Sequence, residues 1–259
     1  MNNELRMIGG LSLYVLKNKE DALKKAGEDI SEYIKKNSGD GILLLFSGGS
    51  ALGILNHLET QSPSLFLRIL AIFFHLEVKP PSGLTVAVLD ERYDEADKNN
   101  NFFQLMQTGF YKRAKDVGAS FIDTRVNGRQ ESELAGYFEG ELRKWKKEHP
   151  NGKIIATAGV GADGHTSGIM PFPEDEKKFN ELFEADGWVA SYDASGKREQ
   201  KKRITTTNTF LKNIDEIFVF ISGEEKRKAL ENMRKDGRVA EIPARILKEI
   251  KGSIYTDIK

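Results

Sequence analysis

Cysteine is absent from this sequence of 259 residues. Its absence excludes a disulfide scaffold, a zinc site with Cys ligands, an iron–sulfur cluster and a thiol nucleophile. It also suits a reducing compartment, so we expect a cytoplasmic location. A surplus of charge of either sign is absent too, because 39 Lys and Arg balance 39 Asp and Glu. A general nucleic-acid binder needs surplus cations to meet phosphates, so we expect no nucleic-acid partner.

Long apolar runs are also lacking. The longest, Leu65–Leu76, has twelve residues, whereas a membrane-spanning helix needs about 20. We interpret this run as a buried helix, with a membrane-surface or partner-docking face as the alternative. The first ten residues are mixed and polar, unlike a secretory signal. We therefore expect no membrane partner, and a monomer or a small homo-oligomer.

Short apolar runs alternate with helical patterns along most of the chain. Runs that predict strands are Ser12–Leu16, Ile42–Phe46, Leu84–Leu89, Lys153–Ala158 and Ile217–Ile221. Helical spacing is clearest at Lys19–Lys36, Gln130–Glu148 and Glu224–Lys235. A continuous apolar run marks a strand that is buried on both faces of a parallel sheet. The alternation predicts an α/β fold with a mostly parallel sheet flanked by helices. No linker interrupts it, so we expect one domain over 1–259.

The glycine turn Ser47-Gly48-Gly49-Ser50 follows the run at 42–46. In such folds ligands bind beyond the carboxyl ends of the strands. Two glycines allow backbone N–H groups to approach a ligand, and the start of a helix at Ala51–Leu55 would add its positive end. Both features suit a phosphate. The turn lacks the lysine of a Walker A motif, and a tight turn with a capping serine is the alternative.

Charged residues follow the next run, as Asp90-Glu91-Arg92. Because they stand at a buried strand end, we expect these charges to point into the ligand crevice. Arg92 would then pair with an acidic neighbour or with an anionic substrate, and a local ion-pair cluster is the alternative. The polar stretch that follows predicts a loop, with Asn101 as the cap of a helix beginning at Phe102.

The segment Gly159–Thr166 follows the run at 153–158 and formally contains the dinucleotide fingerprint G-x-G-x-x-G. That motif requires a sustained helix next, and Pro171 and Pro173 leave too little room for one, so we expect no dinucleotide site. Asp163 and His165 instead flank a glycine in a turn. A carboxylate beside an imidazole fixes its tautomer and raises its basicity, as a general base requires. Structural roles are assigned to the other histidines, which are His57, His75 and His149.

Two further cations stand near predicted strand edges. Arg203 begins a β-prone run, Arg203–Thr207, and Lys226 lies where a helix opens after the run at 217–221. Both fit an anion-binding site, and ordinary surface charge explains them equally well. The basic stretch Lys197–Arg203 predicts a solvated loop or an edge that faces a phosphate.

In this order the motifs resemble those of the 6-phosphogluconolactonase family, within the wider glucosamine-6-phosphate isomerase/6-phosphogluconolactonase superfamily. The resemblance extends from about Leu11 to the C-terminal strand, and Asp163-Gly164-His165-Thr166 is its most specific element. It implies a modified Rossmann-like fold. It also implies hydrolysis of 6-phospho-D-glucono-1,5-lactone to 6-phosphogluconate in the oxidative pentose phosphate pathway. The implied partner is a phosphorylated sugar lactone, with no cofactor and no metal.

The resemblance also implies roles for individual residues. His165 would deprotonate the attacking water, with Asp163 orienting it or stabilising its charge. Arg92 or amides of the turns would stabilise the oxyanion. The residues expected to bind the substrate and its phosphate are Ser47, Gly48, Gly49, Ser50, Asp90, Asn101, Arg203 and Lys226.

Three other functions are alternatives. The related glucosamine-6-phosphate deaminases carry Ile after the histidine and Glu five residues beyond it. Here these positions are Thr166 and Met170, which disfavours deaminase chemistry. The others are a sugar-phosphate-binding regulator without turnover and a nicotinamide-dependent oxidoreductase. The chain also departs from the lactonase pattern, at positions that we expect on the rim of the site and that bear on substrate range: Ala51, Leu52, Asp94, Phe172 and Arg245.

Overall fold

The structure is a computed structural model that describes residues 6–37, 39–58, 83–94, 96, 98–195 and 202–259. The apolar run Leu65–Leu76 lies outside the described residues. So does most of the basic stretch Lys197–Arg203, of which Lys202 and Arg203 are described.

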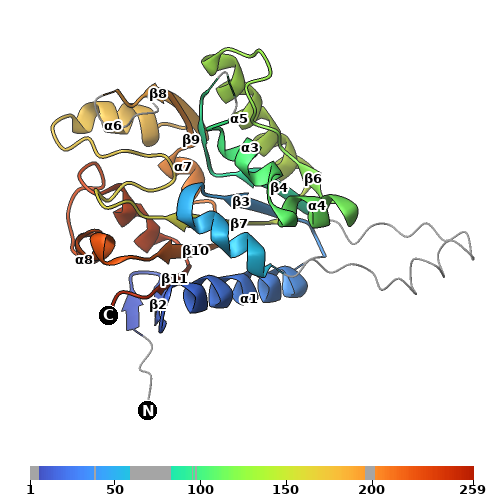
Figure 1. The fold of residues 1–259 in the computed structure, drawn as a ribbon. Helices are drawn as coiled ribbons and strands as arrows, with labels where there is room; N and C mark the ends of the chain where they lie inside the picture. The colour runs from blue at the N-terminus through green and yellow to red at the C-terminus, as the bar shows by residue number, and fades with distance from the viewer. Residues whose placement is uncertain (1–5, 38, 59–82, 95, 97, 196–201) are drawn as a thin grey trace, which may run out of the picture.

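A sheet of eight strands forms the centre of the molecule, in the order β1-β2-β11-β10-β7-β3-β4-β6 (Figure 1). Neighbouring strands are parallel, except for the antiparallel pair β1 and β2. The strands are β1 (Arg6–Ile8), β2 (Leu11–Val15), β3 (Ile42–Phe46), β4 (Leu84–Val88), β6 (Ser120–Phe121), β7 (Lys153–Gly159), β10 (Glu216–Ile221) and β11 (Gly252–Thr256). Each of the five runs predicted as strands forms one, within one residue at each end, and the α/β fold is confirmed.

The two faces of this sheet are both covered by apolar side chains. In β3, Ile42, Leu44 and Phe46 belong to one hydrophobic core. Leu43 and Leu45 belong to the other. Successive side chains of a strand point to opposite faces, so a strand between two cores must be apolar throughout. This is the physical origin of the continuous apolar run.

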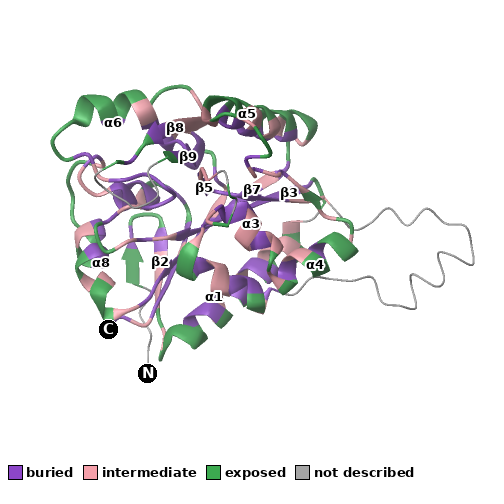
Figure 2. Cartoon of the chain, turned by 45° about the horizontal axis from the view of Figure 1, so that its top comes forward, coloured by how far each residue is buried: buried purple, intermediate pink, exposed green. Residues whose placement is uncertain are grey.

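Helices cover each face (Figures 1 and 2). The core that contains Phe46 includes side chains of α1 (Lys19–Asn37), η1 (Gly49–His57), α3 (Asn101–Met106) and α4 (Gly109–Asp116). The other core includes side chains of α5 (Glu131–Glu148), α6 (Glu176–Phe183), α7 (Asn208–Leu211), α8 (Arg227–Arg234) and η3 (Pro243–Glu249). The helix expected after the glycine turn forms as the 3-10 helix η1. The one expected at 224–235 forms as a short 3-10 turn, η2 (Glu224–Lys226), followed by α8.

A second, antiparallel sheet has the strand order β5-β9-β8. Its strands are β5 (Asp90–Arg92), β8 (Val189–Asp193) and β9 (Lys202–Thr206). The buried Leu89 connects it to the main sheet, since its N–H donates to Phe46 O and its carbonyl accepts from Thr206 N–H. The three charges at 90–92 therefore form a strand of their own, and the sequence did not predict this sheet.

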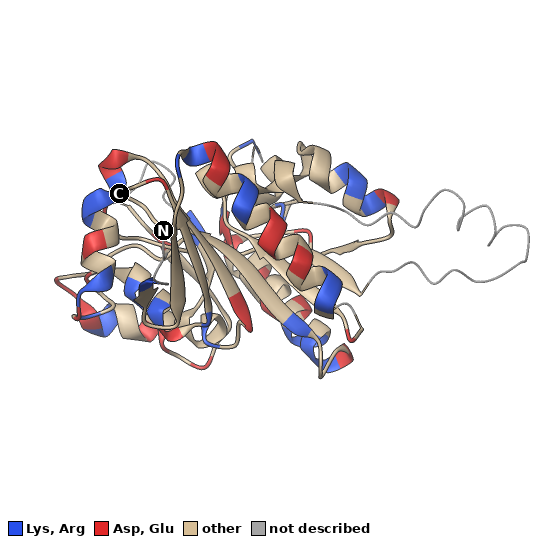
Figure 3. Ribbon diagram, turned by 90° about the horizontal axis from the view of Figure 1, so that it is seen from below, with Lys and Arg blue, Asp and Glu red and all other residues tan. Residues whose placement is uncertain are grey.

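Charged residues of both signs are spread over the helices, whereas the strands of the main sheet carry few (Figure 3). This distribution fits the overall neutrality of the sequence. In the described part of the chain, no helix is both long and apolar enough to cross a membrane.

Candidate active site

A cleft of about 510 Å³ opens where the ends of β3, β7 and β10 meet the strands β5 and β9. It lies at the carboxyl edge of the parallel strands, the usual ligand position in such sheets. The eleven residues predicted for the site come from separate segments of the chain. All of them line this cleft: Ser47, Gly48, Gly49, Ser50, Asp90, Arg92, Asn101, Asp163, His165, Arg203 and Lys226.

The glycine turn leaves β3 and enters η1. Gly49 has a φ of 70°, a backbone conformation that favours glycine. Gly48 packs against Asn101, since a Cβ there would lie 2.4 Å from the side-chain Oδ1. Gly48 also occupies the N-cap position of η1, with no side-chain cap. The capping-serine interpretation is therefore wrong, and no serine side chain covers the first amides of η1 from that position.

Lys226 reaches this turn from the segment after β10, a strand that only β7 separates from β3 in the main sheet. Its Nζ donates a hydrogen bond to Ser50 Oγ at 3.4 Å. Burial lowers the pKa of Lys226, and the carboxylate of Glu225 acts in the opposite direction. The turn after β3 and the turn after β10 thus place an ammonium group beside a run of backbone amides.

The histidine turn follows β7. His165 Nδ1 lies 2.5 Å from Asp163 Oδ1, and the His165 N–H donates to the same oxygen at 3.3 Å. Gly161 lies beneath the ring, because a Cβ there would come within 2.0 Å of Nδ1. Gly164, with a φ of 84°, permits the tight reversal between the two functional residues.

No helix follows this turn. Instead Thr166 forms isolated bridges with Val160 and with Ile169. The next helix in the chain, α6, begins only at Glu176. The structure therefore lacks the helix N-terminus on which a dinucleotide fingerprint depends, as the prolines predicted.

Two buried charges, from β5 and β9, also line the cleft. Asp90 and Arg203 are 5% and 6% exposed, and Arg203 Nη1 lies 3.8 Å from Asp90 Oδ2. Asn101 Nδ2 donates to Asp90 O at 2.9 Å and to Asp90 Oδ2 at 3.3 Å. Burial raises the pKa of Asp90, against the opposing effect of Arg203 and Arg92.

Arg92 stands directly opposite Arg203 in the pairing of β5 with β9. Like charges at opposed positions repel each other, so an anion between them would be stabilising. Within the described residues, Arg92 Nε and Asn101 Oδ1 are buried and have no hydrogen-bond partner. A buried polar atom left without a partner is costly, so both atoms suit a polar ligand.

Glu91 does not point into the cleft, contrary to our expectation. Alternation along β5 places Asp90 and Arg92 on one face and Glu91 on the other. Its fully buried carboxylate accepts hydrogen bonds from the N–H groups of Asn101 and Phe102 and from Thr124 Oγ1. Burial raises the pKa of Glu91 to about 8, although these hydrogen bonds oppose the shift.

Asn101 is not the helix cap that the sequence suggested. The cap of α3 is Asn100, whose Oδ1 accepts from Phe103 N–H at 2.9 Å. With the capping role taken by its neighbour, the Asn101 side chain is directed to the cleft and to Asp90.

Sequence reasoning missed several lining residues beyond the histidine. Ser167 and Gly168 line the cleft with φ values of 52° and 74°. A Cβ on Gly168 would lie 2.6 Å from Asp90 Cβ, so only glycine allows this approach. Tyr192 Oη donates to Gly168 O at 2.5 Å and accepts from Met170 N–H at 3.2 Å. No apolar run directly precedes Ser167 and Gly168, so the sequence offered no signal for them.

The five departures from the lactonase pattern do not line the cleft, contrary to expectation. Ala51 and Phe172 are core residues, and Arg245 is 8% exposed within η3. These side chains take part in core packing or in local hydrogen bonds. Met170, which stands where deaminases carry glutamate, does line the cleft.

The chain is similar to known proteins of one family. The family model described as glucosamine-6-phosphate isomerases/6-phosphogluconolactonase matches residues 17–256. The chain belongs to this family. A 6-phosphogluconolactonase of Helicobacter pylori strain J99 is 27% identical over 246 residues, which are 92% of this chain and 93% of that protein.

Solved structures of the family share the fold. The 6-phosphogluconolactonase of Plasmodium vivax superposes with a TM-score of 0.72 at 15% identity, covering 97% of this chain and 92% of that one. A monomeric glucosamine-6-phosphate deaminase superposes with a TM-score of 0.67 at 16% identity, covering 94% and 96%. Because lactonase and deaminase share it, the fold does not separate the two activities.

Proposed function

We propose that this protein hydrolyses 6-phospho-D-glucono-1,5-lactone to 6-phosphogluconate. The observation that carries the proposal is the Asp163–His165 pair, which shares one cleft with the glycine turn and with three cations. Membership of the family and the curated lactonase that is 27% identical over most of both chains also support it. The oxidative pentose phosphate pathway, a cytoplasmic location and a single domain over 1–259 belong to the same proposal.

The chemistry requires a base, a site for the oxyanion and a proton for the leaving group. Because Asp163 engages Nδ1, His165 Nε2 takes the proton from a water that attacks the lactone carbonyl carbon. Asp163 stabilises the imidazolium that forms, and Arg92 stabilises the tetrahedral oxyanion. The ester bond then breaks, and the imidazolium returns the proton to the ring oxygen as it leaves. Water and lactone are thereby converted to the hydroxy acid.

The remaining residues bind the substrate. Its phosphate lies on the amides of the glycine turn, with Lys226 and Arg203 supplying charge. Asp90 and Asn101 Oδ1 are buried acceptors that receive hydroxyl groups of the sugar. Since the protein is neutral overall, the attraction for a phosphorylated substrate is local to this cleft.

Deaminase activity is the second candidate, because the family and the fold include it. The deaminases have a glutamate at the position of Met170, which lines the cleft here. A thioether carries no proton to transfer, so this site lacks that group for opening an amino-sugar ring.

The test is to give purified protein two substrates. With 6-phosphogluconolactone, 6-phosphogluconate is measured through a coupled dehydrogenase, and with glucosamine 6-phosphate, released ammonia is measured. We expect lactone opening well above the rate without protein and no ammonia. Ammonia without lactone opening would establish the deaminase. Binding of 6-phosphogluconate without turnover would establish a regulator, and binding of NAD(P) would reopen the oxidoreductase alternative.

A further inference from the structure

A buried arginine, Arg245, organises the loop between α8 and η3. Its guanidinium donates to Arg238 O at 2.8 Å, to Asn232 O at 3.3 Å and to Glu241 Oε2 at 3.2 Å. Gly237 makes room for this group, since a Cβ there would lie 2.4 Å from Nη1. One side chain thus joins both ends of the segment 232–241.

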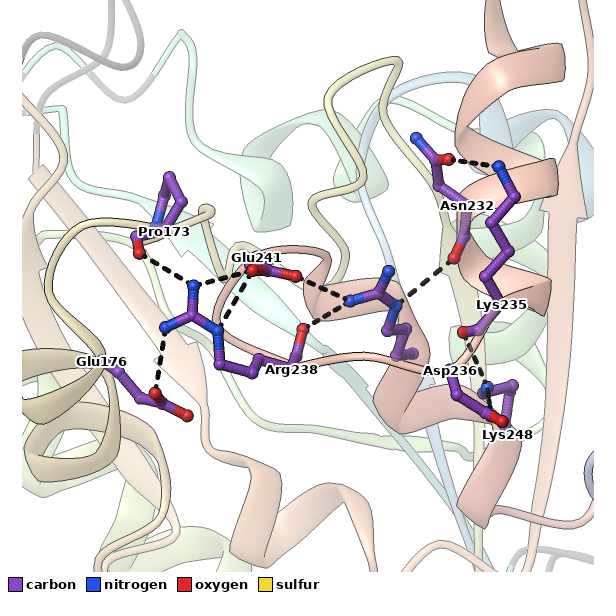
Figure 4. Close-up of polar contacts among 9 residues, drawn as sticks. Pro173, Glu176, Asn232, Lys235, Asp236, Arg238, Glu241 and Lys248 are labelled. Atoms are coloured by element: carbon purple, nitrogen blue, oxygen red, sulfur yellow. Dashed lines mark hydrogen bonds and ion pairs between the residues drawn. The ribbon is translucent and has the colours of Figure 1, made fainter.

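This loop is also fixed on its outer side (Figure 4). Arg238 donates to Glu241 Oε1 at 2.7 Å, to Glu176 Oε2 at 3.1 Å and to Pro173 O at 3.3 Å. Glu241 therefore lies between two guanidinium groups, those of Arg238 and Arg245. The ion pairs connect the loop to the start of α6, which the chain reaches shortly after the histidine turn.

The far end of the loop rests on the histidine turn itself. Ala244 N–H donates to Gly164 O at 2.9 Å. Ile242 covers the same residue, because a Cβ on Gly164 would lie 2.9 Å from Ile242 Cγ2. Gly164 stands between Asp163 and His165, so movement of Ile242 or Ala244 is transmitted to the catalytic pair.

We propose that Arg245 is a positioning residue for His165, acting through Ile242 and Ala244 on the backbone of Gly164. Arg245 does not line the cleft, so it contacts no substrate. Its effect is on the placement of the base and not on binding. The activity part of this inference rests on the proposed lactonase function.

The main variant is Arg245→Met, which keeps much of the side-chain volume and removes the donors. We expect kcat to fall about 10-fold, because displacing a catalytic group by a fraction of an ångström slows the chemistry. KM should stay within about 2-fold, since the phosphate site is untouched. Arg245→Lys keeps the positive charge and one hydrogen-bonding group, so part of kcat should be restored.

The matched control is Arg143→Met. Arg143 also connects two segments, donating to Glu139 Oε1 at 2.7 Å and to Asp186 O at 3.1 Å, and it stacks on Trp188. None of these three contacts involves the histidine turn, so kcat should stay at the wild-type value. A similar fall in both variants would show a general loss of stability and would overturn the proposal.

Hydrogen exchange of the Ala244 amide provides a readout that needs no activity. We expect exchange in Arg245→Met to be about 10-fold faster or more, and exchange in Arg143→Met to be unchanged. If the wild type does not open the lactone, the proposed function fails while this measurement still tests the contact. If Arg245→Met does not fold, Glu241→Gln, which weakens the pairs to both arginines, replaces it. Normal kcat and normal Ala244 exchange in a folded variant would contradict the proposal.

Discussion

The two walls of the cleft are built in different ways. The turn wall, formed by 47–50 and 159–168, is mostly glycine and backbone, with the partly exposed pair Asp163 and His165. The strand wall, formed by β5 and β9, presents Asp90 and Arg203, which are almost fully buried, next to Arg92. The turn wall depends on backbone conformation, and the strand wall depends on charges held in a sheet before any ligand arrives.

This difference suits the tasks proposed for His165 and for the buried charges of the strand wall. A base must gain and lose a proton during turnover, which suits a partly solvated histidine with one carboxylate partner. Groups that bind an anion or hydroxyls work best when they are fixed and desolvated beforehand. Substitution of His165 in the turn wall should therefore change kcat, and substitution of the buried pair Asp90 and Arg203 in the strand wall should change binding and stability.

The largest expected effect belongs to the turn wall. Replacing His165 by Asn removes the proposed general base, and kcat should fall by about two to four orders of magnitude. The Kd for 6-phosphogluconate should remain within a few-fold of the wild-type value, because the strand wall is intact. Steady-state kinetics and calorimetric titration of the product measure both quantities. Turnover close to normal would remove His165 from the mechanism.

A buried cation of the strand wall, Arg203, can be compared with Lys226, which hydrogen-bonds Ser50 of the turn wall. Arg203→Met leaves the buried carboxyl of Asp90 without its ionic partner, and losing one partner of a buried pair costs about 3–5 kcal/mol of stability. Lys226→Met removes a half-buried cation whose described hydrogen bond is to a serine. It should weaken product binding roughly 10- to 100-fold with little loss of stability.

Urea unfolding and product titration of both variants measure this contrast. Equal losses of stability in Arg203→Met and Lys226→Met would contradict this contrast. They would show that the buried cation of the strand wall contributes no more to stability than the half-buried Lys226.

The smallest expected effect concerns Glu91, the buried residue between Asp90 and Arg92 in the strand wall. Burial raises the pKa of Glu91 to about 8 in the folded protein, from an ordinary value of 4.5. A raised pKa gives stability that is present below pH 4.5 and is lost as the pH rises towards 8. Glu91→Gln cannot titrate, so it should lack this loss.

The comparison uses urea unfolding of the wild type and Glu91→Gln at pH 5 and pH 8.5. The wild type should lose stability relative to the variant by about 1.4 kcal/mol or more, the equivalent of one pKa unit. Parallel pH profiles would show that Glu91 keeps its ordinary ionisation in the fold.

The turn wall was predictable because each of its parts directly follows a short apolar run that predicts a strand. The run at 42–46 predicts a doubly buried strand, and glycines directly after it mark the ligand edge. The turn containing His165 could be found in the same way. Its further lining, Ser167 and Gly168, could not, because their positive φ values depend on the approach of Asp90.

The strand wall was predictable in its residues but not in its form. A strand of three residues such as β5 has no periodicity to detect, and it exists through its pairing with β9. That pairing decides which of Asp90, Glu91 and Arg92 faces the cleft. It also decides the helix cap, because the Glu91 carboxylate receives the first N–H groups of α3 and leaves the capping position to Asn100.

The structure of the complex with 6-phosphogluconate tests the account most directly, because it shows how one ligand meets both walls. We expect the phosphate to lie on the amides of the glycine turn, with Arg203 and Lys226 beside it. We also expect the carboxylate of the ligand to lie at His165. One of its oxygens should be within about 3.2 Å of Nε2 or joined to it through one water. A phosphate bound against His165, or a ligand bound outside the cleft, would contradict it.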